Sequence, residues 1–479
     1  MRPFARTHLI KLTIFCTLLS ACQSKELFSP VQSTSVSDPV ATQWLGFGYN
    51  QDPLDRNNEG HNIAEWDINR WKITKNRIDY IRPSFVRINL YRHWFNDSGI
   101  VGEYDWNSPK MHSLYQVLDY YKEKDIPVMT GMWQSTLDHK DDVPFYVSTG
   151  SDSFQQLQID LFQHLYHAKG YFNIRWYTPT NEPKGMGMDF QKWSNMMRNT
   201  FQGFLNAKLP LSKFTGADSW EDWTAAAAIY NKKELSAYDH HYYLNLGIDE
   251  VIYGRLELML KKEVAKIREI DSDQKPIFLS EVGFTNTSEL DYWYVLKTLP
   301  IVNPTTWIYG LLALDYGIQV ARSGESGALA WSLDGYDYGK DPGMWNIAGN
   351  NGGIKFRPWY YTWSMLCRYF PPGGTLYPIS FNSNKTRGVS IEQKSQNKSH
   401  WSFAFVNWEE KEIEAQIKVP NFQGGSFVKI QFNELIPGDG TSLSLPKENI
   451  QINSSVEGFK VKIPANGGLV ITSMENSPI

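Results

Sequence analysis

Apolar and polar residues follow two different patterns along the chain, and the change falls near residue 372. Before it, short apolar runs are followed by longer stretches in which apolar residues recur every three or four positions. The short runs are typical of buried strands, and the longer stretches are typical of helices with one apolar face. Strands are predicted at 44–49, 85–90, 126–133, 174–180, 214–219, 238–243, 276–281 and 327–333.

Each of these eight strands precedes a predicted helix, and this alternation indicates a parallel sheet. Eight strand–helix units within 44–372 fit a closed (β/α)8 TIM barrel with insertions. An open, doubly wound sheet is the alternative. No glycine-rich phosphate-binding loop follows an early predicted strand, which favours the barrel.

After the Pro-Pro-Gly-Gly segment at 371–374, apolar residues largely alternate with polar ones in short runs separated by turn residues. A period of two is typical of half-buried antiparallel strands. The segment 373–479 is therefore predicted to be a C-terminal antiparallel β-sandwich.

The chain begins with a segment that is typical of a targeting signal. Basic residues precede an apolar run at 12–19 that is too short to span a bilayer. The following Leu19-Ser20-Ala21-Cys22 resembles a bacterial lipobox, which implies that 1–22 is a lipoprotein signal peptide and that Cys22 carries lipid. An ordinary secretory signal with an incidental cysteine is the alternative. The polar segment 23–43 is predicted to be a flexible tether, and the lipid anchor implies a place in the bacterial cell envelope, outside the cytoplasm.

Composition narrows the function without deciding it. The net charge of -4 provides no basic surface, so a nucleic-acid partner has no electrostatic support. Only Cys367 follows the signal segment, so no intrachain disulfide is expected.

Two predicted strands end in glutamate. The fourth runs into Asn181-Glu182-Pro183, and the seventh ends in Ser280-Glu281. A carboxylate at the end of a buried strand is costly unless it is paired or has a function. In a parallel barrel, the carboxyl ends of the strands are where active sites are built. A surface glutamate in a turn is the simpler interpretation of Glu182 alone.

These two motifs, on the fourth and seventh strands, resemble those of glycoside hydrolase clan A, the retaining (β/α)8-barrel glycosidases. Similar motifs occur in the cellulase-like family 5 and in family 39, and the sequence does not decide between them. The resemblance implies that Glu182 is the acid/base, that Glu281 is the nucleophile and that Asn181 contacts the sugar 2-hydroxyl. It also implies a β-linked polysaccharide or oligosaccharide as the substrate.

Other candidate residues lie on neighbouring strands. Arg87 lies within the apolar strand 85–90, where its charge could keep the nucleophile ionised or form a structural ion pair. On the sixth strand, alternation places His241 and Tyr243 on one face and His240 and Tyr242 on the other. The resemblance favours His241 and Tyr243 at the site. Trp331, near the end of the eighth strand, resembles a floor for the bound sugar, and a core tryptophan is the alternative.

No cofactor or metal is expected. The chain has no Gly-x-Ser-x-Gly, His-Glu-x-x-His or Cys-x-x-Cys motif. His240 and His241 are adjacent on a predicted strand and therefore point apart, which disfavours a shared metal. Two rivals to a hydrolase remain: a non-catalytic glycan-binding surface lipoprotein and a structural lipoprotein whose barrel binds nothing.

Overall fold

The computed structural model describes most of the chain between residues 32 and 475. The described residues are 32–51, 68–132, 151–185, 187–210, 213–244, 248–284, 303–334, 343–345, 355–395, 398–420, 422–453 and 458–475. The predicted signal peptide and Cys22 lie outside them, so lipid attachment stays a prediction. None of the helices in the described ranges has the length and apolar character required to cross a bilayer.

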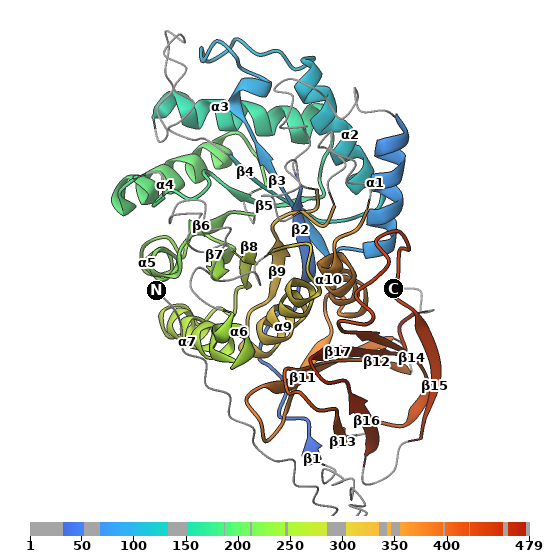
Figure 1. Ribbon diagram of the computed structural model, residues 1–479. Coiled ribbons are helices and arrows are strands. Elements are labelled where there is room, and N and C mark those ends of the chain that lie inside the picture. Colours follow the sequence, from blue (N-terminus) through green and yellow to red (C-terminus); the bar gives the residue numbers. More distant parts are fainter. Residues whose placement is uncertain are drawn as a thin grey trace, which may run out of the picture. The chain divides into compact units, whose positions relative to one another are not determined.

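Eight parallel strands form one sheet (Figure 1). Each strand lies beside the next strand along the chain, and the last strand, β9, pairs with the first, β2. At the other junction Tyr177 pairs with Phe214, and its N–H donates to the carbonyl of Lys213 over 2.7 Å, which closes the sheet. The predicted barrel is confirmed. Its strands are β2 (Gly46–Gln51), β3 (Phe85–Leu90), β4 (Val128–Met132), β5 (Ile174–Thr178), β6 (Thr215–Ser219), β7 (Ala237–Leu244), β8 (Ile277–Phe284) and β9 (Gly327–Ala330).

The helices follow the strands and surround them (Figure 1). Polar side chains cap several helices: the Ser108 hydroxyl accepts from the Met111 N–H, with Pro109 in the first turn. Gly254, at φ +71°, separates the short helix α6 from the longer α7. The helices are α1 (Ile68–Ile81), η1 (Arg92–Trp94), α2 (Pro109–Glu123), α3 (Asp152–Gln163), η2 (His164–Ala168), α4 (Phe190–Asn206), α5 (Glu221–Tyr230), α6 (Asp249–Ile252), α7 (Arg255–Ile270), α9 (Trp307–Ser323) and α10 (Pro358–Tyr369).

The C-terminal residues form the predicted β-sandwich. A six-stranded sheet in the order β10-β11-β12-β17-β14-β15 faces a three-stranded sheet in the order β1-β13-β16. A cluster of buried aromatic side chains, including Phe403, Phe405 and Phe459, fills the space between them. The strands are β10 (Thr375–Ser380), β11 (Thr386–Ser395), β12 (Lys398–Asn407), β13 (Ile413–Lys418), β14 (Gly424–Phe432), β15 (Lys447–Asn453), β16 (Phe459–Ile463) and β17 (Gly467–Thr472).

Strand β1 (Gln32–Ser35) comes from the segment that the sequence predicted to be a tether. It pairs in parallel with β13, and farther along the chain the Val40 N–H donates to the carbonyl of Leu376 over 2.9 Å. The prediction of a flexible tether is therefore wrong from Gln32 to Val40. Polar composition suggested a tether, but the free edge of β13 provides the hydrogen-bond partners that such a segment lacks by itself.

A buried ion pair joins α9 of the barrel to the sandwich. Arg387, on β11, contacts the carboxylate of Asp315 on α9, and the two side chains are 5% and 0% exposed. The indole N–H of Trp408 donates to the same carboxylate over 2.7 Å. Because both charges are removed from water, each depends on the other for compensation.

Replacing Arg387 with Met should therefore lower the free energy of unfolding by about 3 kcal/mol or more, since it leaves Asp315 buried without its cation. Urea denaturation followed by tryptophan fluorescence measures this loss. Lys429→Met is the control, because the Lys429–Glu448 pair is 26% and 62% exposed and should contribute less than about 1 kcal/mol. Equal losses in the two variants would contradict the role assigned to the buried pair.

Candidate active site

Charged and amide side chains from six strands meet at the carboxyl end of the barrel. The sequence predicts a glutamate at the ends of two of these strands, β5 and β8. The other four strands supply the groups that surround the two glutamates. The residues are Asn50 on β2, Arg87 on β3, Asn181 and Glu182 directly after β5, Asp218 on β6, His241 and Tyr243 on β7, and Glu281 on β8.

Arg87 is at the centre of this cluster and is fully buried. Its guanidinium donates to Asp218 over 2.7 Å and to Asn181 over 2.8 Å, and it also contacts Glu281. Burial acts to lower the pKa of Arg87, but the carboxylates of Asp218 and Glu281 outweigh it and raise the pKa above its usual range. One fixed cation therefore holds two carboxylates and an amide in place.

Glu281 is held through both of its carboxylate oxygens. Oε1 contacts Arg87, and Oε2 accepts a hydrogen bond from the Tyr243 hydroxyl over 2.6 Å. A register shift in the pairing of β7 with β8 makes His241 the partner of Glu281 and leaves Ser280 without one. This bulge lets consecutive residues of β8 reach the site, because it interrupts the alternation of side chains. The strand also continues to Phe284, beyond the predicted end.

Glu182 lies on a turn that the neighbouring strands hold in place. Its N–H donates to the carbonyl of Asp218 over 2.9 Å, and its φ of +40° is unusual for a residue with a side chain. The side chain is 36% exposed, whereas that of Glu281 is 4% exposed. Burial acts to raise the pKa of Glu182, but the hydrogen bond and charge of His241 outweigh it and lower the pKa. Of the two glutamates, Glu182 is the one open to solvent.

His241 lies between the two glutamates and is fully buried. Its Nδ1 is 2.9 Å from Glu182 Oε1 and 3.6 Å from Glu281 Oε2, while its Nε2 is 2.9 Å from Asp218 Oδ1. Burial acts to lower the pKa of His241, but the carboxylates of Glu281 and Asp218 raise it well above the ordinary value. With a carboxylate oxygen 2.9 Å from each ring nitrogen, these surroundings favour the protonated imidazole, which can donate to both.

The structure resolves the face of β7 that the sequence left open. His241 and Tyr243 point to the glutamates, and His240 points away to a buried pair with Glu325, 3.1 Å apart. Trp331 is half-buried just after β9, where its N–H donates to the carbonyl of Val282 over 2.9 Å. No contact described for Trp331 tests its role as a sugar floor, which stays a prediction.

Sequence reasoning missed Asp218 and Asn50. Asp218 is fully buried and accepts from Arg87 and His241, which lower its pKa although burial acts to raise it. The adjacent Asp239 has its pKa raised to about 7 by burial and by Asp218. Asn50 accepts from Arg87 over 3.0 Å. The available signal was the one that identified Arg87: a polar residue within a barrel strand.

Glu182, His241 and Glu281 are also close enough to suggest a metal site, since one ligand atom of each lies within 4.8 Å of the others. The donor set fits a cation poorly. Nδ1 of His241 is already paired with Glu182 and Nε2 with Asp218, so a metal at this place would have to displace the partner of Nδ1. Arg87 and His241 already provide the positive charge that the carboxylates require.

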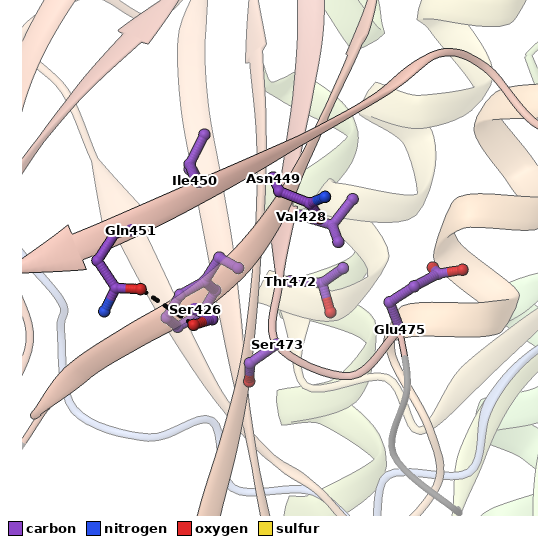
Figure 2. Close-up of a pocket in the computed structure, with 9 residues that line it drawn as sticks. Ser426, Val428, Asn449, Ile450, Gln451, Thr472, Ser473 and Glu475 are labelled. Carbon is purple, nitrogen blue, oxygen red and sulfur yellow. Dashed lines mark hydrogen bonds between the residues drawn. The ribbon is translucent and has the colours of Figure 1, made fainter.

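A hollow of about 410 Å³ lies on the sandwich, between β14, β15 and β17. Ser426 donates over 3.0 Å to Gln451, its partner on the neighbouring strand, and Glu475 lies at the other side of the view (Figure 2). Glu475 is the one carboxylate that lines it, and it is paired with Lys447 over 2.6 Å. This hollow therefore lacks the two facing acids found in the barrel.

Comparisons with known proteins agree with this architecture. No protein-family model matches the chain, and no curated protein matches it by sequence. A GH30 endoxylanase from Clostridium papyrosolvens C71 aligns with a TM-score of 0.62 at 10% identity, over 92% of this chain and 99% of the other. An α-L-arabinofuranosidase from Thermotoga maritima aligns with a TM-score of 0.62 at 13% identity, over 92% and 99%. SrfJ from Salmonella typhimurium aligns with a TM-score of 0.62 at 12% identity, over 93% of each chain. At such identities the similarity shows a shared fold, a barrel followed by a β-sandwich.

Asp218→Asn should lower the pKa of His241, because Asp218 is one of the carboxylates that raise it. Titration of the histidine ring protons by NMR measures the shift. Asp249→Asn, on the exposed surface of α6, is the control and should leave the His241 titration unchanged. An unchanged His241 pKa in Asp218→Asn would contradict this account of the site's charges.

Proposed function

We propose that this protein is a retaining glycoside hydrolase that cleaves O-glycosidic bonds in a β-linked glycan, with Glu182 as acid/base and Glu281 as nucleophile. The observation that carries the proposal is the spacing of the two acids. A carboxylate oxygen of Glu182 lies within 4.8 Å of one of Glu281. Retaining enzymes place their carboxyl groups about 5–5.5 Å apart, whereas inverting enzymes separate them by about 6.5–9.5 Å to admit a water molecule.

In the first step, Glu281 attacks the anomeric carbon while Glu182 gives a proton to the departing oxygen. A glycosyl ester of Glu281 forms, and the leaving group departs with its new hydroxyl. Glu281 suits this role because Arg87 and Tyr243 fix both of its oxygens. Glu182 suits the other role because its side chain is the more exposed, so that a leaving group can reach it.

In the second step, water attacks the anomeric carbon of the glycosyl ester and Glu182 accepts the proton of that water. The bond to Glu281 breaks, and the anomeric configuration is retained. Asn181 contributes to both steps in this proposal. Its Oδ1 accepts from Arg87 over 2.8 Å, so its amide nitrogen is oriented to donate to the sugar 2-hydroxyl.

His241 and Glu182 hold the catalytic proton as a pair. The Nδ1-to-Oε1 distance of 2.9 Å allows the proton to move between them as the leaving oxygen approaches. The raised pKa of His241 and the lowered pKa of Glu182 widen, at both ends, the pH range over which the pair holds one proton. Asp218, on the far nitrogen, fixes the orientation of the imidazole.

The names of the structural neighbours bear on the substrate. They include endoxylanases and arabinofuranosidases, so a test panel contains xylans and arabinofuranosides beside β-glucans, β-mannans and galactans. The lipid anchor proposed at Cys22 would place the site outside the cytoplasm, where polysaccharides are available. The resemblance to families 5 and 39 stays a prediction.

Glu182→Gln and Glu281→Gln should each abolish most hydrolysis of the substrate found in this panel, by about 10²-fold or more. Chromatography of the released sugars measures the rates, and Glu448→Gln, an exposed change on the sandwich, is the control. NMR of the first product formed should show the configuration of the substrate. A binding lipoprotein would bind glycan but release no sugar in the wild type, and an inverted product would rule out the double displacement.

His241→Gln should move the basic limb of the kcat/KM profile to lower pH. In the wild type, activity falls as pH rises through the raised pKa of His241, above the ordinary 6.5. Without the imidazolium, the proton resides on Glu182 alone and leaves as pH rises through the lower pKa of a carboxyl group. His112→Gln, an exposed histidine on α2, is the control. A basic limb that stays in place would contradict the shared proton.

A further inference from the structure

Trp220 is a large aromatic side chain exposed at the carboxyl end of the barrel. It follows β6 directly and is 41% exposed, although burial of such a ring is strongly favourable. The exposed Ile229 and Tyr230 are near the other end of α5, about 15 Å away for a helix of this length. Trp220 is therefore not part of a continuous apolar patch with them.

The ring of Trp220 lies beside the turn that carries Glu182. A Cβ atom placed on Gly185 would be 3.6 Å from Cη2 of Trp220 and 3.7 Å from Cβ of Glu182. The same point would be 3.4 Å from the carbonyl oxygen of Glu182. The absence of a side chain at residue 185 keeps the space between the ring and the acid open.

The backbone that carries the ring is fixed in this place. The carbonyl of Trp220 accepts hydrogen bonds from the N–H groups of Trp223, over 3.0 Å, and Thr224, over 3.3 Å. These bonds start α5, so the residue is held between a barrel strand and a helix. A platform on such a backbone needs no change of backbone conformation when a ligand stacks on it.

A polar pair borders the ring. The ammonium of Lys184 is 5.1 Å from the ring centre and 2.7 Å from a carboxylate oxygen of Asp222. Both side chains are substantially exposed, at 39% and 57%, so their attraction is weak and leaves them able to rearrange. Together they offer donors and an acceptor for hydroxyl groups at the edge of an aromatic face.

We propose that Trp220 is the stacking platform for the sugar on the leaving-group side of the scissile bond, with Lys184 and Asp222 binding its hydroxyls. The inference rests on the proposed function: Glu182 protonates the leaving oxygen, so the sugar that bears this oxygen lies beside Glu182. Flat aromatic rings match the apolar faces of β-linked pyranose rings. The substrate class is then an oligosaccharide or polysaccharide, and a glycoside with a small leaving group does not use the platform.

The test compares two substrates that differ only on that side. β-Glycosyl fluorides of xylose, glucose, mannose, galactose and their disaccharides have a leaving group too small to stack, and the matching oligosaccharides have a sugar there. Trp220→Ala should lower kcat/KM on the oligosaccharide by about 10-fold or more and leave the fluoride within about 2-fold, while Trp220→Phe should restore much of the loss. Phe172→Ala is the control, since Phe172 is 62% exposed and precedes β5, at the opposite end of the barrel.

Each outcome decides between the two proposals. If Trp220→Ala leaves both substrates unchanged, or lowers both equally with a normal melting temperature, the stacking platform is overturned and the hydrolase stands. If Trp220→Ala unfolds, Trp220→Phe decides alone: it must keep the ratio of the two substrates close to that of the wild type. If the wild type turns over no substrate of either kind, the proposed function fails and the platform fails with it.

Discussion

The candidate site depends on one buried cation. Arg87 contacts Asp218, Glu281, Asn181 and Asn50, which come from four different barrel segments. An arginine buried without partners would cost several kcal/mol, and so would each carboxylate without the arginine. Because each charge compensates the others, the cluster fixes the relative positions of the strand ends. The spacing of Glu182 and Glu281 follows from this arrangement.

His241 gives the two glutamates different surroundings. His241 approaches Glu182 more closely than Glu281, and Asp218 on its far side raises its pKa. Glu281 is instead held by Arg87 and by a neutral hydroxyl. One glutamate thus faces an imidazole, while the other contacts a guanidinium and a hydroxyl group. Two chemically identical side chains acquire different environments, which is what acid/base and nucleophile require.

Much of this arrangement could be predicted from the sequence because a barrel obeys simple rules. Counting strands placed Glu182 and Glu281 at the same end, and alternation paired His241 with Tyr243. Asp218 was missed because it lies in a short strand that also contains other small and polar residues, so it did not stand out as Arg87 did. The bulge at Ser280 and the pairing of β1 with β13 are set by tertiary contacts that leave no local pattern.

The covalent step is the central claim, and trapping tests it most directly. The protein would be incubated with 2-deoxy-2-fluoro-β-glycosyl fluorides of the candidate sugars, which slow the second step more than they prevent the first. Mass spectrometry of the intact protein and of its peptides would then locate any adduct. This account predicts one fluorosugar per chain, attached to Glu281. An adduct on another residue, or none with a sugar whose glycosides the protein hydrolyses, would contradict it.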